Sequence, residues 1–218
     1  MLSPLSLGHV GLCFQLAATL PVRPAETHYQ EVALQHQAVS PDSLRDLDVW
    51  DEQAAEWRKP KANEVAAEQA PVLLLHFWAS WCKPCLEEFP VWRELAPRLE
   101  ALYQGKVRIL YVALQTNNTD MEKFLTDNKD RLPRASWYLD VGEHVTAPLR
   151  KGLPGDRFPM PVTLWLDRQR IVRQAVAGSI LQRRAEVVDS TARMVRLSDQ
   201  LDRLKPAPPT KTQAAPKK

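Results

Sequence analysis

The stretch that decides the fold reads Phe77-Trp78-Ala79-Ser80-Trp81-Cys82-Lys83-Pro84-Cys85. An apolar run from Val72 to Ala79 leads straight into this Cys-x-x-Cys motif, and a long helical pattern follows it. Two thiols three residues apart, at a junction between a strand and a helix, can close a small disulfide and open it again. The motif therefore predicts redox chemistry at Cys82 and Cys85.

Two other interpretations of the motif are a structural disulfide and one half of a zinc site. A zinc site needs two further ligands. The only other cysteine is Cys13, and the five histidines are scattered along the chain without a His-x-x-His pair. The spacing therefore favours a redox dithiol over a metal site.

Length and composition predict one domain with appendages. The chain has 218 residues, of which 44% are hydrophobic, and this is enough for a sizeable core. The net charge of +3 is concentrated at the end of the chain, because residues 205–218 hold four lysines and no acidic residue. Without these four charges the remainder carries −1. A nearly neutral body gives no reason to expect nucleic acid or an acidic membrane as the main partner.

The first 25 residues have some features of an export signal. The segment from Leu5 to Leu20 is moderately apolar and contains small residues near its end, but no Lys or Arg precedes it. It is too short and too polar to predict a membrane span. We interpret residues 1–25 as a signal peptide, which predicts a periplasmic or other extracytoplasmic location; a cytoplasmic location is the alternative. Cleavage would leave Cys82 and Cys85 as the only cysteines.

Strand and helix patterns alternate along the middle of the chain. The predicted strands are Val72–Ala79, Val107–Leu114, Ser136–Asp140, Val162–Asp167 and Ile171–Ala177. The predicted helices are Pro84–Tyr103, which Pro90 should kink, Thr119–Asn128, opened by a capping box of Thr119 and Glu122, and Ser179–Leu204. This order predicts parallel strands followed by a hairpin, and hence an α/β fold.

Two further expectations concern the ends of this pattern. In the N-terminal part, Leu47–Trp50 could be a strand and Ala62–Ala70 a short helix. In the last helix, one apolar stripe is expected to face the core; its members are Leu181, Ala185, Val188, Ala192 and Val195.

The motifs resemble those of the thioredoxin superfamily, and in detail those of its TlpA/ResA-type thiol–disulfide oxidoreductases. The resemblance rests on residues 77–90, on Met160-Pro161-Val162-Thr163 and on the continuation of that stretch to Asp167, and it covers about residues 71–204. It implies a thioredoxin-like fold, with a central mixed sheet flanked by helices. We accordingly expect an N-terminal extension at 26–60, the thioredoxin-like domain at 61–204 and a disordered Pro/Ala/Lys tail at 205–218.

The position of the thiols predicts their roles. Cys82 should lie just ahead of the helix, where unpaired N–H groups and the helix dipole favour a thiolate, so it is the candidate nucleophile. Cys85, one turn further on, can resolve a mixed disulfide. Pro84 suits the first helical turn. Lys83 could add positive charge beside Cys82 or simply be solvated, and Trp81 could cover the disulfide, serve packing, or both.

The resemblance implies a second part of the site at Met160 and Pro161. Pro161 would be the cis-proline of the superfamily, next to the dithiol in space, and the backbone of Met160 would be free to pair with an extended substrate. The alternative is an ordinary trans-proline at the start of an edge strand.

Glu88 and His76 are candidates for tuning proton transfer. Glu88 lies three residues after Cys85 and thus on the same helix face, and ResA-like proteins carry a glutamate at this place. An acid on a helix is otherwise usually solvated. Many thioredoxins have a buried acid at the strand position of His76, where this chain has a titratable imidazole. A satisfied core histidine is the alternative.

These residues predict a protein thiol–disulfide oxidoreductase, expected to be an envelope reductase that works through a mixed disulfide. A net oxidase or isomerase, or a copper carrier on the same fold, is the alternative. The redox disulfide itself would be the only redox group, without a separate cofactor or metal. Expected partners are client proteins with cysteine thiols or disulfides and an upstream thiol donor, which could be a membrane protein.

Overall fold

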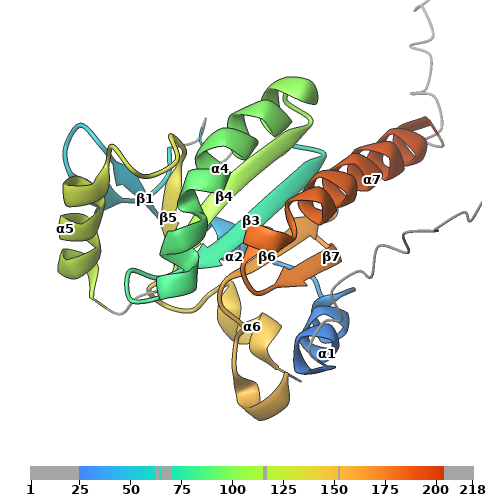
Figure 1. Ribbon diagram of the computed structural model, residues 1–218, viewed down its shortest axis with the longest axis horizontal. Coiled ribbons are helices and arrows are strands. Elements are labelled where there is room, and N and C mark those ends of the chain that lie inside the picture. The colour runs from blue at the N-terminus through green and yellow to red at the C-terminus, as the bar shows by residue number, and fades with distance from the viewer. Residues whose placement is uncertain (1–24, 62–63, 65–69, 115–116, 152, 204–218) are drawn as a thin grey trace, which may run out of the picture.

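The computed structural model describes residues 25–61, 64, 70–114, 117–151 and 153–203. Seven strands form one sheet in the order β2-β1-β5-β4-β3-β6-β7 (Figure 1). The strands are β1 Asp48–Asp51, β2 Glu56–Arg58, β3 Val72–Trp78, β4 Val107–Ala113, β5 Trp137–Leu139, β6 Val162–Leu166 and β7 Val172–Ala177. β3, β4 and β5 pair in parallel, and every other neighbouring pair is antiparallel.

Helices cover both faces of this sheet (Figure 1). They are α1 Ala25–Leu34, α2 Pro41–Arg45, α4 Lys83–Leu102, α5 Asn118–Asn128, α6 Thr146–Arg150 and α7 Arg184–Arg203, with short 3₁₀ turns at Pro154–Asp156 and Ile180–Gln182. None of the helices in the described part of the chain is long and apolar enough to cross a bilayer.

The core forms around β3, in which all seven residues are buried. Leu74 and Trp78 face the side covered by α4 and α7 and pack there with Trp92 and Val187. Leu73, Leu75 and Phe77 face the opposite side with residues of α1 and α6. A central strand covered on both faces needs an apolar residue at nearly every position, which explains the continuous apolar run of the sequence.

The predicted order of strands and helices is confirmed. The five expected strands are β3 to β7, and the thioredoxin-like mixed sheet with a terminal hairpin is present. α4 runs without interruption through Pro90 and Pro97. Predicted strand and helix ends differ from the observed ones by one or two residues in most cases.

Two predicted helix starts are wrong. α5 begins one residue before Thr119, and its N-cap is Asn117, whose side chain accepts the N–H groups of Thr119 and Asp120. Ser179 caps the 3₁₀ turn Ile180–Gln182, and the long helix α7 starts only after it. At α5 the side chain-to-backbone hydrogen bonds of Asn117, rather than the predicted capping box of Thr119 and Glu122, cap the start of the helix.

The apolar stripe predicted for α7 is confirmed at Val195, which is buried, and at Val188, which packs against the core, but not at Ala185, which is exposed. Leu181 precedes the helix and is exposed, whereas Val187, Thr191, Met194 and Ser198 are buried. The Trp165 indole N–H donates to the Thr191 hydroxyl over 2.9 Å, and that hydroxyl donates to the Val187 carbonyl. Because these bonds satisfy Thr191 inside the core, a polar residue occupies the buried face.

The N-terminal segment is built onto the same sheet. β1 pairs with β5 and with β2, so the expected strand near Leu47–Trp50 is confirmed as Asp48–Asp51, and β2 extends the edge. Glu31 of α1 accepts the Ala177 N–H and pairs with Arg183, each through Oε1. The expected helix at 62–70, the signal at 1–25 and the tail at 205–218 lie largely or wholly outside the described residues.

The β1–β2 edge carries an ion-pair cluster that should stabilise it at neutral pH. The Arg58 guanidinium donates to both Glu64 carboxylate oxygens and to Asp51. The pKa of Glu64 is lowered from 4.5 to about 2, mainly by the hydrogen bonds from Arg58. When folding lowers the pKa of a carboxyl group, the group stabilises the folded state fully at pH values above its pKa in the unfolded chain. This stabilisation declines as the pH falls toward its pKa in the folded state.

Glu64→Gln should therefore lower the free energy of unfolding at pH 7, and the difference from wild type should shrink as the pH falls from about 5 to about 2. Urea unfolding between pH 2 and pH 7 measures it. Glu52→Gln, an exposed change on the same hairpin, is the control. A difference between Glu64→Gln and wild type that does not depend on pH would contradict the role of the ion pair.

Candidate active site

The two cysteines lie at the N-terminus of α4, as predicted. Cys82 is the N-cap residue with extended backbone angles, and its carbonyl accepts the N–H groups of Cys85 and Leu86. The two sulfurs are joined in a disulfide of 2.00 Å. Cys82 is 5% exposed and Cys85 fully buried, so Cys82 is the sulfur that an incoming thiol reaches first.

Pro161 follows a cis peptide bond from Met160, which confirms that expectation. Val162, the next residue, pairs with Phe77 of β3. This antiparallel register puts Pro161 at the end of β3 that leads to Cys82. Among the described residues the Met160 backbone takes part in no hydrogen bond, while the Pro161 carbonyl accepts the Gly178 N–H over 2.8 Å.

His76 and Glu88 meet in the core between β3 and α4. Both side chains are fully buried, and His76 Nε2 lies 2.9 Å from Glu88 Oε1. The two atoms are close enough for an ion pair when the imidazole is protonated, although they are not aligned as a hydrogen bond. The other carboxylate oxygen accepts the Ile180 N–H over 2.8 Å. Glu88 is therefore not a solvated helix residue.

The second ring nitrogen of His76 reaches β6. Nδ1 lies 3.1 Å from the Thr163 hydroxyl, two residues after Pro161. His76 thus contacts both the helix that begins at the dithiol and the strand that follows the cis-proline. Sequence reasoning chose His76 and Glu88 separately and missed that they touch, and it missed Thr163 as a partner. The only sequence feature that pointed to Thr163 was its membership of the Met160–Thr163 motif.

Aromatic rings enclose this buried pair. Trp92 and Tyr111 lie with ring centroids 5.0 Å and 5.6 Å from the His76 ring. Burial, with smaller effects from the carboxylates of Glu100 and Glu88, raises the pKa of Tyr111 well above its ordinary value of 10.0. The phenol therefore stays neutral at physiological pH and cannot act as a base there.

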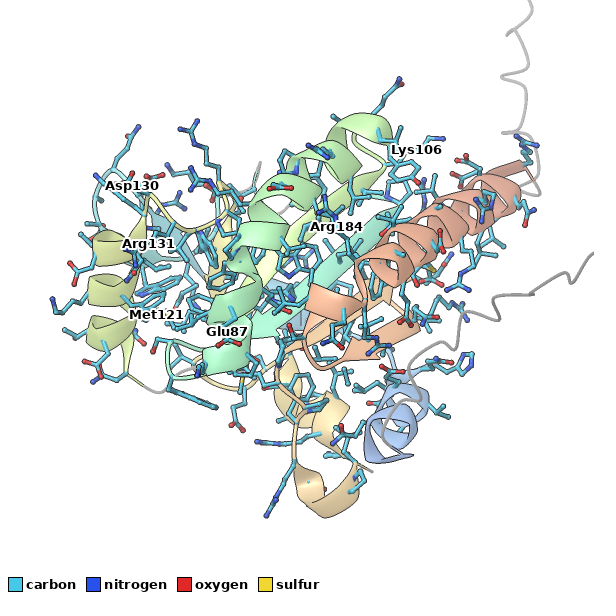
Figure 2. All side chains as sticks on the ribbon, viewed as in Figure 1. Glu87, Lys106, Met121, Asp130, Arg131 and Arg184 are labelled. Carbon is cyan, nitrogen blue, oxygen red and sulfur yellow. A yellow bond between two sulfur atoms is a disulfide. The ribbon has the colours of Figure 1, made fainter. Side chains whose placement is uncertain are left out.

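The remaining predicted site residues lie around the mouth of the dithiol. Trp81 is 67% exposed, which does not fit a purely packing role. The Lys83 ammonium is mostly exposed and lies 3.8 Å from Glu87, four residues along the helix. Figure 2 shows Glu87 on the outside of the first turns of α4. Pro84 is in the first turn, where it needs no N–H partner.

A metal site is not formed by the part of the chain that the structure describes, since no group of three or more His, Cys, Asp or Glu side chains is placed to hold an ion there. The chemistry that the described site can support is thiol–disulfide exchange at Cys82 and Cys85, with a buried acid–imidazole pair behind the helix.

Comparisons with known proteins find sequence similarity over part of the chain. Residues 71–145 match a family model described as thioredoxin-like, and the match includes His76, Cys82, Cys85 and Glu88 but not Pro161. The thiol-disulfide oxidoreductase ResA of Geobacillus kaustophilus is 31% identical over 108 residues, which cover 50% of this chain and 55% of the relative. ResA of Bacillus anthracis is 28% identical over 108 residues, or 49% of this chain and 54% of the relative.

Solved structures show the same fold at low identity. A secreted thiol-disulfide isomerase from Corynebacterium glutamicum aligns with a TM-score of 0.50 and 20% identity, over 73% of this chain and 97% of that one. The chain spans about half the length of the curated relatives it matches. The family-model match and the mixed sheet show a thioredoxin-like domain, and about half of this chain is similar in sequence to curated ResA-type thiol–disulfide oxidoreductases.

Proposed function

We propose that the protein is a thiol–disulfide oxidoreductase that reduces disulfides in client proteins. One observation carries the proposal: a Cys-x-x-Cys disulfide at a helix N-terminus whose two sulfurs differ in access, at the end of β3 where the register also puts cis-Pro161. The difference in access suits a chemical cycle in which one thiol attacks and the other resolves.

The proposed cycle begins with the reduced dithiol. The Cys82 thiolate attacks a client disulfide, one client thiolate leaves, and a mixed disulfide forms between Cys82 and the client. Cys85 then loses its proton and attacks the Cys82 sulfur, which releases the second client thiol and forms the Cys82–Cys85 disulfide. The client has gained two electrons and two protons, and an upstream thiol donor must return them to the protein.

In this proposal Met160 and Trp81 position the substrate. The Met160 backbone is available to pair with an extended client segment, as in strand addition. Trp81 offers an exposed aromatic surface next to Cys82. The net direction depends on the reduction potential, and potentials across this fold range from about −270 to about −120 mV. Equilibration with glutathione would distinguish a reductase from an oxidase or isomerase.

Variants of the two cysteines test their assignment. Cys85→Ser should accumulate mixed disulfides with client proteins because no resolving thiol remains, whereas Cys82→Ser should accumulate none. Non-reducing electrophoresis followed by mass spectrometry identifies the adducts. In the reduced protein, alkylation should label Cys82 before Cys85. Faster labelling of the buried Cys85 would reverse the roles.

We propose that Glu88 and His76 modify the reactivity of the dithiol from the buried side of α4. A buried carboxylate one turn beyond Cys85 disfavours the charged thiolate. Glu88→Gln should therefore lower the apparent pKa of the thiol titration and shift the pH profile of exchange toward lower pH. Glu87→Gln, on the exposed neighbour, is the matched control and should leave both unchanged. A thiol titration of Glu88→Gln equal to wild type would remove Glu88 from the mechanism.

The contribution of His76 needs a measurement that separates function from packing. His76→Ala should lower the free energy of unfolding by about 3 kcal/mol, because it leaves a cavity and a buried carboxylate with one partner fewer. His76→Asn keeps a polar group near Thr163 and should alter the pH profile of insulin reduction, expressed per folded molecule. An unaltered profile in His76→Asn would assign His76 to the core alone.

We also propose that the protein acts outside the cytoplasm, on the sequence pattern of residues 1–25. Protein isolated from its native host should begin after about residue 20 and fractionate with envelope or secreted proteins. N-terminal sequencing of the purified protein measures this. An intact Met1 in the cytosolic fraction would favour a cytoplasmic role.

A further inference from the structure

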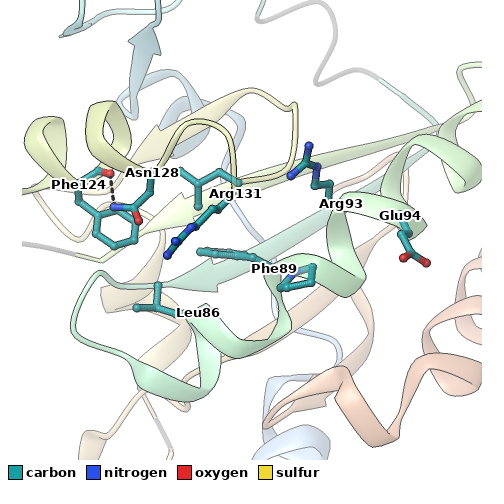
Figure 3. Close-up of a pocket in the computed structure, with 9 residues that line it drawn as sticks. Leu86, Phe89, Arg93, Glu94, Phe124, Asn128 and Arg131 are labelled. Carbon is teal, nitrogen blue, oxygen red and sulfur yellow. Dashed lines mark hydrogen bonds between the residues drawn. The ribbon is translucent and has the colours of Figure 1, made fainter.

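A groove lies between α4 and α5, on the side of the dithiol helix away from α7 (Figure 3). Its volume is about 670 Å³, which is within the range of sites that bind small ligands or several side chains. Leu86, Phe89 and Phe124 supply apolar surface. Trp78 lies beneath, with its ring centroid 5.0 Å from that of Phe89 and 5.6 Å from that of Phe124. The apolar surface is thus backed by a rigid aromatic core.

The groove begins beside the redox motif. Leu86, the residue after Cys85, lines it, and Phe89 follows one turn later. A polypeptide whose cysteine had reacted with Cys82 could therefore continue along α4 into this groove. No residue of the groove belongs to the cis-proline segment, so the groove is separate from the Met160 strand-pairing edge.

Two prolines remove backbone hydrogen-bond donors inside α4. Pro90 has no N–H to donate to the Leu86 carbonyl, and Pro97 has none for the Arg93 carbonyl. Leu86, Pro90 and Arg93 all line the groove. These two carbonyls therefore lack their usual helical donors.

The polar rim of the groove is positively charged. Arg93 donates to the Asp130 backbone carbonyl, and Arg131 lies across the groove from α4 (Figure 3). Neither guanidinium forms an ion pair with the residues that the structure describes. The lining acid, Glu94, points away from the apolar surface in Figure 3 and lies 3.5 Å from Arg184 of α7. Two cations without acidic partners beside an apolar surface complement a ligand that is apolar and acidic.

We propose that this groove binds an extended segment of the client protein, with an aliphatic or aromatic side chain next to a carboxylate, during thiol–disulfide exchange. The apolar side chain would lie against Phe89 and Phe124, and the carboxylate would meet Arg131 and Arg93. The proposal rests on the proposed oxidoreductase function and adds to it a preference for the client sequence beside the reacting cysteine.

Two disulfide peptides that differ by one residue test the preference. One carries Leu-Asp a few residues after a cysteine, and the other carries Leu-Lys. Arg131→Glu should raise KM for the Leu-Asp peptide about tenfold, equivalent to about 1.4 kcal/mol, with kcat nearly unchanged. KM for the Leu-Lys peptide should not rise. Arg98→Glu, an equal charge change on an exposed residue of α4 outside the groove, is the matched control.

A small uncharged disulfide, bis(2-hydroxyethyl) disulfide, separates this proposal from the proposed function. All variants should reduce it at the wild-type rate, because it does not reach the groove. If wild type reduces neither this compound nor any peptide, the oxidoreductase function fails. If wild type reduces both peptides with the same KM, or if Arg131→Glu behaves like Arg98→Glu, only the groove proposal fails.

A binding measurement adds a readout that does not depend on turnover. A fluorescein-labelled, cysteine-free version of the Leu-Asp peptide should bind the oxidised protein, and both Arg131→Glu and Phe124→Ala should weaken its anisotropy signal. Arg131 is preferred to Arg93 for substitution, because Arg93 also donates a hydrogen bond to the Asp130 carbonyl just after α5. If sedimentation shows that Arg131→Glu dissociates a dimer, the groove serves a second copy of the chain and the proposal is wrong.

Discussion

The arrangement of the site depends on the buried contact of His76 with Glu88 and Thr163. One imidazole on the central strand touches the helix that carries the dithiol and the strand that follows cis-Pro161. Burying a carboxylate without partners would cost several kcal/mol, so Glu88 can lie inside the core only because His76 and the Ile180 N–H surround it. The contact therefore fixes the positions of β3, α4 and β6 relative to one another.

The surroundings of this contact make it sensitive to charge. Trp92 and Tyr111 exclude water from the His76 ring, and the Tyr111 hydroxyl and the Trp92 indole N–H have no partner among the described residues. In such a poorly polarisable environment, a proton gained or lost by one group changes the energy of its neighbours more than it would in water. In the proposed exchange reaction Cys85 loses a proton at the start of the same helix, and we propose that charge at Glu88 influences that step.

The segments at the margins of the sheet protect its edges. β1 and β2 extend the sheet beyond β5, and α1 packs against β7 with Glu31 bound to the Ala177 N–H and to Arg183. Because Ala177 pairs with Val162, the contact of Glu31 lies at the same end of the sheet as cis-Pro161. Trp81 is exposed, the backbone of half-buried Met160 makes no hydrogen bond among the described residues, and the α4–α5 groove lies on the surface.

The sequence by itself determined the central strand, the dithiol helix and the order of the elements that follow them, because a strand buried on both faces and a Cys-x-x-Cys at a helix start leave local patterns. It also indicated His76, Glu88 and Pro161 one at a time. Only the tertiary structure decided that His76 meets Glu88 and Thr163, residues 12 and 87 positions away along the chain, because strand register and helix packing bring them together. The same reason explains α7, where a long-range bond from Trp165 puts Thr191 in the core, a polar residue that apolar periodicity does not predict there.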